Sequence, residues 1–317
     1  MVSPVTIPIS ILPNFSLANI KVLHLEITTD CQAACPQCAR EHPELYQHEI
    51  NRAQLSLDHI TKQFDTKFLG GLHKVMLCGN YGDPAAGTHT LEILRYFRSI
   101  NPNVTLGLNT NGGIRNPDWW AELASILQGT NDYVVFSIDG LEHTNHVYRR
   151  NVSWHKLMNN VKSFVAHGGP AHWDMLVFAH NEHEIDSCRA LAIQLGFKWF
   201  RAKISNRFQE RPVNFLSPPK GLKLSVVPLT ASKITCHAQQ ERSIYMCATG
   251  EVMPCCFMGV YAFRRDPDLD RSLASKNFSD VVSRWSTNPL SVCTKNCTEF
   301  DNTTTFLGQF RIEDQLA

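Results

Sequence analysis

The chain has 317 residues and an almost balanced charge, with 30 Lys and Arg residues against 29 Asp and Glu residues. A net charge near zero argues against a surface that coats a polyanion, so nucleic acid is not an expected partner. The first basic residue is Lys21 and no apolar run reaches spanning length, which excludes a typical signal peptide and a membrane span. Eleven cysteines, an odd number, cannot all pair as disulfides, so we expect a reduced, cytoplasmic protein.

Residues 1–20 are interpreted as an N-terminal extension, and alternating apolar and β-branched residues predict a strand over 22–28. Three cysteines follow that strand with the spacing Cys31-x3-Cys35-x2-Cys38. Thiolates this close together can hold three corners of an iron–sulfur cluster and leave the fourth iron without a protein ligand. A zinc site is the alternative, although the loop supplies only three of the four ligands that zinc usually takes.

A three-cysteine loop directly after a first strand resembles the radical S-adenosylmethionine (SAM) superfamily. The resemblance implies a [4Fe-4S] cluster on Cys31, Cys35 and Cys38, whose open iron chelates the amino and carboxylate groups of SAM. It also implies reductive cleavage of SAM to a 5′-deoxyadenosyl radical, with a flavodoxin- or ferredoxin-type electron donor. The residue before the third cysteine, often aromatic in this family and packed on the adenine, is Gln37 here, which leaves the adenine contact unassigned.

Strands and helices alternate over the next part of the chain. Further strands are predicted over residues 74–78, 104–108, 133–138, 174–179 and 198–202. Helices are predicted from the N-cap Ser56 to Phe68 and over residues 91–100, 117–127, 154–167 and 184–195. Six strands joined by helical crossovers indicate an α/β fold, an open partial (β/α)6 barrel of the TIM type over residues 21–208. Ligand-binding residues are then expected just after each strand, at the carboxyl edge of the sheet.

The residues Gly82-Asp83-Pro84 follow the second predicted strand. They resemble the Gly-Gly-Glu-Pro motif of the superfamily, with Asp83 in place of the usual Glu. The resemblance implies that Gly82 and Asp83 meet the amino group of the cofactor. Apart from its position, the same stretch is an ordinary turn.

Polar groups also follow the third and fourth strands, where a ribose would lie: Asn109 and Asn111, then Ser137 and Asp139. The segment 137–150 resembles the Ser-Ile-Asp-Gly…His…Arg stretch of the branch of the superfamily that modifies peptides. In this interpretation Arg149 or Arg150 pairs with the cofactor carboxylate. The alternative is that both arginines are solvated at the start of a helix.

Residues 209–232 are rich in proline and are interpreted as a linker to a cysteine-rich region over 233–317. Within that region Gly250 lies between two strand-like stretches, 243–246 and 252–253, and predicts a hairpin turn that brings Cys236 and Cys255 together. The spacing Cys236-x13-Gly250-x4-Cys255 resembles the opening of SPASM and twitch extensions, without the further cysteines of a full SPASM pattern.

The resemblance implies a twitch-like domain with one auxiliary [4Fe-4S] cluster. Its ligands would be Cys236, Cys255, Cys293 and Cys297. Cys256 is the alternative to Cys255, Cys247 is the alternative to Cys236, and a four-cysteine zinc site would use much the same ligands. The two cysteines within predicted elements of the barrel, Cys78 and Cys188, are expected to be buried apolar residues.

Three functions are compatible with these patterns, and no residue is assigned as catalytic. The favoured one is a radical SAM oxidoreductase that oxidises or cross-links a peptide or protein side chain. The second is dehydrogenation of a small, sugar-like alcohol, which gains weight because residues 1–20 are too short for a separate leader-peptide-binding domain. The third is a non-catalytic zinc or iron–sulfur module that recognises a macromolecule.

Overall fold

The computed structural model describes residues 19–42, 50–205, 207–208, 213–220, 234–259, 285, 287–297 and 306–311, the last range as backbone only. Nearly all of the predicted N-terminal extension and most of the predicted linker lie outside these residues. None of the helices in the described ranges combines the length and apolar character needed to cross a bilayer.

One sheet of nine strands organises the molecule, in the order β8-β7-β1-β2-β3-β4-β5-β6-β9. Its six central strands are parallel and follow the chain: β1 (Val22–Leu25), β2 (Lys74–Leu77), β3 (Thr105–Thr110), β4 (Tyr133–Ser137), β5 (Ala171–Val177) and β6 (Trp199–Ile204). The prediction of six parallel strands is therefore confirmed, and the arrangement is that of a partial TIM-like barrel.

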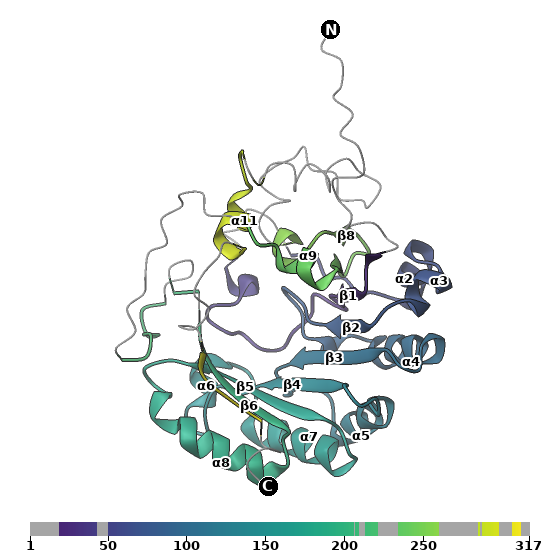
Figure 1. Ribbon diagram of the computed structural model, residues 1–317. Coiled ribbons are helices and arrows are strands. Elements are labelled where there is room, and N and C mark those ends of the chain that lie inside the picture. Colours follow the sequence, from purple (N-terminus) through teal and green to yellow (C-terminus); the bar gives the residue numbers. More distant parts are fainter. Residues whose placement is uncertain are drawn as a thin grey trace.

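Helices cover the outer face of this curved sheet (Figure 1). They are α2 (Leu57–Gln63), α3 (Thr66–Gly70), α4 (Thr90–Ile100), α5 (Pro117–Ile126), α7 (Trp154–Ala166) and α8 (Ile185–Leu195). The short α6 (Asn145–Tyr148) lies in the loop after β4. Single 3-10 turns occur at η3 (Ala39–Glu41), η4 (Pro84–Ala86) and η5 (Glu182–Glu184).

The predicted helix from Ser56 to Phe68 forms as two helices. Ser56 caps α2 as expected, accepting from the His59 amide while the His59 side chain accepts from the Ser56 amide. The Asp65 side chain then accepts a hydrogen bond from the Phe68 amide and starts α3. A second capping residue therefore divides the predicted helix.

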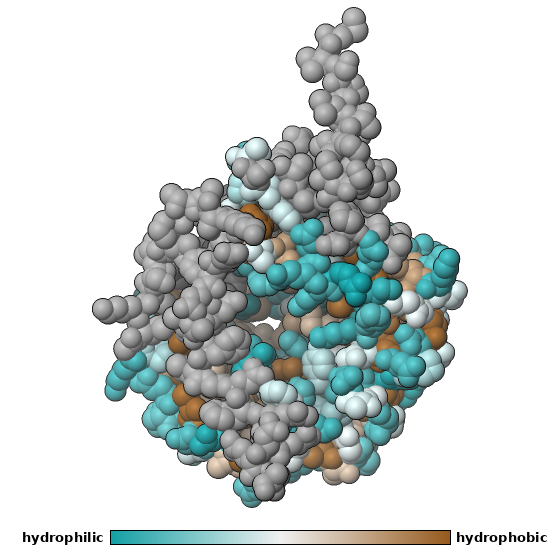
Figure 2. Space-filling model, in the orientation of Figure 1, coloured by the Kyte–Doolittle hydropathy of each residue, from teal (hydrophilic) through white to brown (hydrophobic). Residues whose placement is uncertain are grey.

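Alternate residues of each strand face opposite sides of the sheet, as strand geometry requires. Leu23, Val75 and Leu106 are fully buried beneath the helices. On the opposite face, His24, Met76 and Asn109 are only partly buried and line the inside of the barrel. Figure 2 shows a hollow near the centre of the visible face.

The cysteine-rich region extends the same sheet at both edges. Strand β7 (Ser243–Met246) pairs with β1 in parallel, and β8 (Val252–Met253) pairs with β7 in antiparallel orientation. Strand β9 (Phe306–Arg311) lies antiparallel to β6. Gly250, at the turn between β7 and β8, has a φ of +86° that a side chain rarely tolerates, and the predicted hairpin is confirmed. Backbone hydrogen bonds between β1 and β7 join the barrel to the cysteine-rich region. The predicted boundaries of the two domains stay predictions.

Candidate active site

The cysteine loop begins at the carboxyl end of β1 and is held by residues 51–53. The Thr29 amide donates to the Ala53 carbonyl at 3.1 Å, and its hydroxyl donates to the Asn51 carbonyl at 2.9 Å. Asp30 forms a two-bond ion pair with Arg52, each bond 2.9 Å long. The hydrogen bonds and charge of Arg52 hold the pKa of Asp30 below its ordinary value. The start of the loop is therefore fixed before the first cysteine.

The loops after β2 and β4 also contact the cysteine loop. The Asp83 amide donates to the Asp30 carbonyl at 2.9 Å, and the Ala34 amide donates to the Arg150 carbonyl at 3.1 Å. Gly82 lies so near this loop that a Cβ atom there would come within 1.8 Å of the Thr28 carbonyl oxygen. Glycine is therefore required at position 82 for the two loops to meet.

Asp83 organises the residues beside Cys31. One carboxylate oxygen accepts from the Thr110 hydroxyl at 2.8 Å and the Ala85 amide at 2.9 Å. The other accepts from both the backbone and the side-chain amide of Asn111, each at 2.7 Å. The same side-chain nitrogen of Asn111 lies 3.5 Å from the Cys31 sulfur. Burial raises the pKa of Asp83, and these hydrogen bonds oppose the shift.

Asp139 and Arg149 form the corresponding pair beside Cys35. Arg149 Nε donates to Asp139 Oδ2 at 2.6 Å, and its Nη1 lies 3.7 Å from the Cys35 sulfur. The other Asp139 oxygen accepts from the Leu176 amide at 2.6 Å. Arg150 is instead exposed, with its guanidinium 4.4 Å from the Phe215 ring centre. Of the two arginines considered from sequence, Arg149 is the one directed toward the cysteines.

The thiols of the cysteine loop are close enough to influence one another. Burial raises the pKa of Cys31 to about 12, with Asp83 and the thiols of Cys35 and Cys38 adding to the shift. Burial raises the pKa of Cys35 to about 11, and the positive charge of Arg149 opposes it. Two sulfurs thus face N–H donors from other loops, the kind of hydrogen bonding expected around the thiolates that hold a cluster.

The predicted cofactor residues differ in how exposed they are. Gly82, Asn109 and Ser137 are partly buried at strand ends, whereas Asp83, Asn111 and Asp139 are buried and hydrogen-bonded within the protein. Gln37, at the position often held by an aromatic residue in the family, is fully buried, and its side chain accepts from the Ser205 hydroxyl at 2.7 Å. Gln37 thus links the cysteine loop to the end of β6.

The four cysteines predicted for the second site lie near one another. Cys236 is the N-cap of α9 (His237–Glu241), and Cys293 and Cys297 lie in and just after α11 (Ser291–Asn296). A hydrogen bond between Cys236 and Cys297 raises the pKa of the first and lowers that of the second to about 6. Burial raises the pKa of Cys255 to about 12, and Cys293 and Cys297 add to the shift.

The two alternative cysteines have other surroundings. The Cys247 sulfur lies 3.0 Å from the Thr249 hydroxyl and 3.8 Å from Glu251. Burial raises the pKa of Cys256, and the nearby thiols of Cys255 and of Cys78 in the barrel add to the shift. Within the described ranges, no three His, Cys, Asp or Glu side chains are placed to hold a single metal ion. In a [4Fe-4S] cubane each thiolate binds a separate iron, whereas the ligands of a single metal ion all meet at one atom. The sulfurs of a cluster site therefore lie farther apart than the ligands of a single-ion site.

The two cysteines expected to be apolar core residues also differ. Cys188 is fully buried in α8, as predicted. Cys78 is only partly buried and follows β2, where burial raises the pKa of its thiol to about 11 and the Lys203 ammonium opposes the shift. The prediction for Cys78 was wrong, because residue 78 lies at the end of its strand beside charged groups of the inner face.

Comparison with known proteins agrees with this geometry. The model of the Radical SAM superfamily matches residues 25–191, which is more than half of the chain. The chain belongs to the radical SAM superfamily. Enzymes of this superfamily use a [4Fe-4S] cluster and SAM, and the matched residues include the cysteine loop and the loops that contact it.

Two solved structures share the fold of this radical SAM protein. SuiB of Streptococcus suis, bound to S-adenosylmethionine, has 13% identity and a TM-score of 0.56, covering 85% of this chain and 66% of SuiB. Native anSMEcpe with bound AdoMet has 16% identity and a TM-score of 0.51, covering 74% of each chain. The chain thus spans just under two thirds of SuiB in that structure. Comparison with curated proteins found no match.

A buried polar contact that the sequence did not reveal joins the barrel of this radical SAM protein to the cysteine-rich region. Glu26, just after β1, accepts from the Tyr245 hydroxyl at 2.6 Å and from the Tyr81 amide at 2.8 Å. The Asn80 side chain donates to the Tyr245 oxygen at 3.1 Å and to the Cys256 carbonyl at 2.9 Å. Burial raises the pKa of Glu26. The signal for this contact in the sequence was a carboxyl group, that of Glu26, at the end of an otherwise apolar strand.

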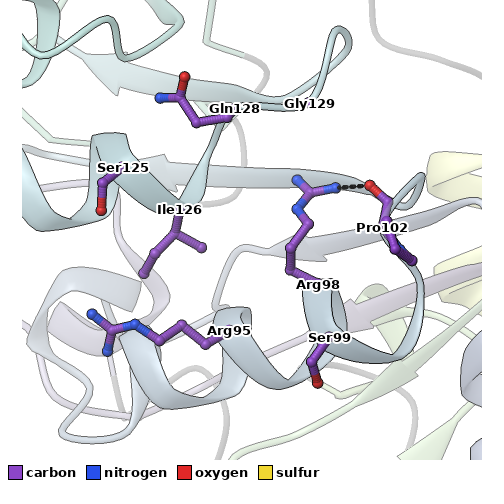
Figure 3. Close-up of a pocket in the computed structure, with 8 residues that line it drawn as sticks. All are labelled: Arg95, Arg98, Ser99, Pro102, Ser125, Ile126, Gln128 and Gly129. Atoms are coloured by element: carbon purple, nitrogen blue, oxygen red, sulfur yellow. Dashed lines mark hydrogen bonds between the residues drawn. The ribbon is translucent and has the colours of Figure 1, made fainter.

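A separate pocket of about 550 Å³ lies between the carboxyl ends of α4 and α5, lined by Arg95, Arg98 and Gln128 among others (Figure 3). Each of these helices leads into the amino end of the next strand. The pocket therefore lies at the opposite end of the barrel from the cysteine loop and is not part of the candidate site.

Proposed function

We propose that this radical SAM protein cleaves S-adenosylmethionine reductively and uses the product to remove a hydrogen atom from a substrate. The observation that carries the proposal is the clamped loop of Cys31, Cys35 and Cys38, with Asn111 and Arg149 facing two of its sulfurs. These three thiols would hold the [4Fe-4S] cluster. When bound, the cluster and SAM supply a 5′-deoxyadenosyl radical.

The protein's own contribution is to orient groups and to exclude water. Asp83 fixes the Asn111 amide, and Asp139 fixes the Arg149 guanidinium, through buried hydrogen bonds. A fixed donor keeps its direction toward a sulfur without reorganising during the reaction. The cofactor would lie along the strand ends, near Gly82, Asn109 and Ser137, with Arg149 as the cation for its carboxylate.

The cysteine-rich region supports a second site in this proposal. Cys236, Cys255, Cys293 and Cys297 would hold one auxiliary [4Fe-4S] cluster in a twitch-like extension over residues 233–317, beyond a barrel over 21–208. The mutual electrostatic influence of these four thiols supports this set over one that includes Cys247, whose thiol faces Thr249. An auxiliary cluster can accept an electron from a substrate radical, which favours net oxidation.

We favour a peptide or protein side chain as the substrate. The segment 137–150 resembles the peptide-modifying branch, and the similar SuiB and anSMEcpe structures include complexes with the precursor peptide SuiA and the Cp18Cys peptide. Dehydrogenation of a small sugar-like alcohol is the second candidate, with a flavodoxin or ferredoxin as electron donor in both cases.

The test is anaerobic reconstitution with iron and sulfide, followed by iron counting and a 5′-deoxyadenosine assay with dithionite and SAM. Two cubanes predict about eight irons per chain. Replacing Cys31, Cys35 and Cys38 together by Ala should remove about half of the iron and all 5′-deoxyadenosine formation. Cys188→Ala, remote in α8, is the matched control and should change neither. A colourless, zinc-loaded protein without cleavage would contradict the proposal.

A further inference from the structure

The turn after β5 carries a histidine at the carboxyl edge of the barrel. Phe178 and His180 lie in this turn, followed by Asn181. The Asn181 side chain accepts from the Phe178 amide at 2.7 Å and donates to the Asp139 carbonyl at 2.9 Å. The turn is therefore fixed against the loop after β4, on the same edge of the sheet as the cysteine loop.

The ring of His180 belongs to a stack of aromatic side chains. Its centre lies 5.4 Å from that of Phe178, with the planes 14° apart, and the Phe178 ring centre lies 4.8 Å from that of Tyr148. The Arg149 guanidinium is 5.3 Å from the Tyr148 ring centre, and its Nη1 is 3.7 Å from the Cys35 sulfur. A continuous series of contacts therefore connects the cysteine loop to His180.

One ring nitrogen of His180 is shielded from solvent. Within the described part of the chain, this nitrogen, Nε2, has no hydrogen-bond partner. Burial lowers the pKa of His180, and the charges of Asp139 and Glu184 oppose the shift. The imidazole is therefore neutral near pH 7, and Nε2 can donate or accept one hydrogen bond, depending on the tautomer. A buried nitrogen with no partner is costly unless a bound group satisfies it.

Among the parts of SAM, the adenine base suits these two features. A purine stacks on aromatic side chains, and its edge offers both an N–H donor and ring-nitrogen acceptors. A ribose offers hydroxyl groups and no flat face. The carboxylate and amino groups of SAM already have proposed partners in Arg149 and in Gly82 and Asp83. The base is the part for which no residue has been assigned.

We infer that His180 recognises the adenine of SAM, with Nε2 hydrogen-bonded to the edge of the base and Phe178 holding the imidazole in place. The inference rests on the proposed function and deepens it, because it assigns a specificity-determining residue to the same site. The base would then lie beside the turn after β5, while the amino-acid part of SAM lies at Arg149.

The test uses the anaerobic, cluster-loaded full chain without reductant, and measures equilibrium binding of two probes by isothermal titration calorimetry. S-adenosyl-L-homocysteine lacks only the methyl group of SAM. S-ribosyl-L-homocysteine is the same molecule with a hydroxyl group in place of adenine. Loss of a contact to the base weakens only the first probe, whereas a general distortion of the site weakens both.

His180→Phe keeps an aromatic ring beside Phe178 and removes the nitrogen. S-adenosyl-L-homocysteine should bind this variant about 3- to 10-fold more weakly than wild type, the range expected for one hydrogen bond between neutral groups. S-ribosyl-L-homocysteine should bind both proteins alike. His180→Gln, which returns an amide near the position of Nε2, should recover part of the loss. His183→Phe, at an exposed histidine in η5, is the matched control and should bind both probes as wild type does.

Urea unfolding without ligand checks that the fold is intact, and His180→Phe should be at least as stable as wild type, because a buried nitrogen without a partner has been removed. Unchanged affinity of His180→Phe for S-adenosyl-L-homocysteine, an equal loss for both probes, or no recovery in His180→Gln would overturn the inference. Failure of the proposed function appears differently, as wild-type protein that does not bind S-adenosyl-L-homocysteine or that forms no 5′-deoxyadenosine with SAM and dithionite.

Discussion

The two groups of cysteines in this radical SAM protein are built in different ways. The first three lie within eight consecutive residues, on a loop hydrogen-bonded to the ends of β2 and β4. The second four come from three separate stretches of the chain, around 236, 255 and 293–297. Among the described contacts, the first group is positioned by hydrogen bonds to the packed barrel. The segments that carry the second group are joined in part by contact between the thiols themselves.

This difference predicts different dependence on metal. A loop fixed by backbone hydrogen bonds and buried carboxylates keeps its shape whether or not iron is bound. Segments that meet mainly at their ligands gain much of their folding free energy from the metal. The barrel should thus be a preformed site, and the cysteine-rich region should be ordered by the auxiliary cluster proposed for it.

Removing iron should produce the largest contrast. After chelation under anaerobic conditions, we expect the backbone amides of α9 and α11 to exchange hydrogen at least about 100-fold faster, because metal binding can supply many kcal/mol of local stability. Amides of β3 and β4 should be unchanged and serve as the internal control in hydrogen-exchange mass spectrometry. Undiminished protection of α9 and α11 would show that the two regions do not differ in this way.

Asp83→Ala should act on the first region. It leaves the Thr110 hydroxyl and the Asn111 and Ala85 amides without their buried acceptor. We expect a loss of about 3 kcal/mol in the free energy of unfolding, measured in urea, and weaker iron binding at the first site only. Asp83→Asn, which keeps an acceptor oxygen, is the milder control. Iron loss from the second site instead would contradict the assignment.

The contact between the barrel and the cysteine-rich region should make the stability of the protein depend on pH through His24. Burial lowers the pKa of His24 to about 4, and its ring lies against Tyr245 with centroids 5.0 Å apart. Between pH 6.5 and 4 the unfolded chain binds a proton at this residue that the folded chain does not, so stability falls as the pH is lowered.

From pH 7 to pH 5 the contribution of His24 should be about 2 kcal/mol. Urea unfolding of wild type and His24→Gln at both pH values measures it, since glutamine keeps a donor for the Cys78 carbonyl. An identical pH dependence in the two proteins would exclude His24 as the titrating group.

Tyr245→Phe should have the smallest effect of the four. It removes one hydroxyl that donates to Glu26 and accepts from Asn80, at a cost of about 1 kcal/mol. Because Asn80 also holds the Cys256 carbonyl, hydrogen exchange should quicken around residues 255–258 and not in β4. Tyr96→Phe, on the half-exposed face of α4, is the control. A change confined to β4 would rule out the proposed link.

Local patterns predicted much of the barrel. Alternating apolar residues indicated the six strands, and polar residues directly after them marked Asp83, Asn111 and Asp139, which the structure brings around the cysteine loop. The division of the helix after Ser56 was missed because Asp65 reads equally well as a helix residue or a cap. The surroundings of Cys78 were missed because a residue at a strand end can face either side.

By itself, the sequence determined the order of the elements, the family and the two groups of cysteines, because periodicity and ligand spacing are properties of neighbouring residues. Only the tertiary structure decided that β7 pairs with β1, that Glu26 meets Tyr245 across 219 residues, and that Lys203 joins Asp174 inside the barrel. These contacts depend on which strands become adjacent when the sheet curves, and no local pattern in the chain encodes that adjacency.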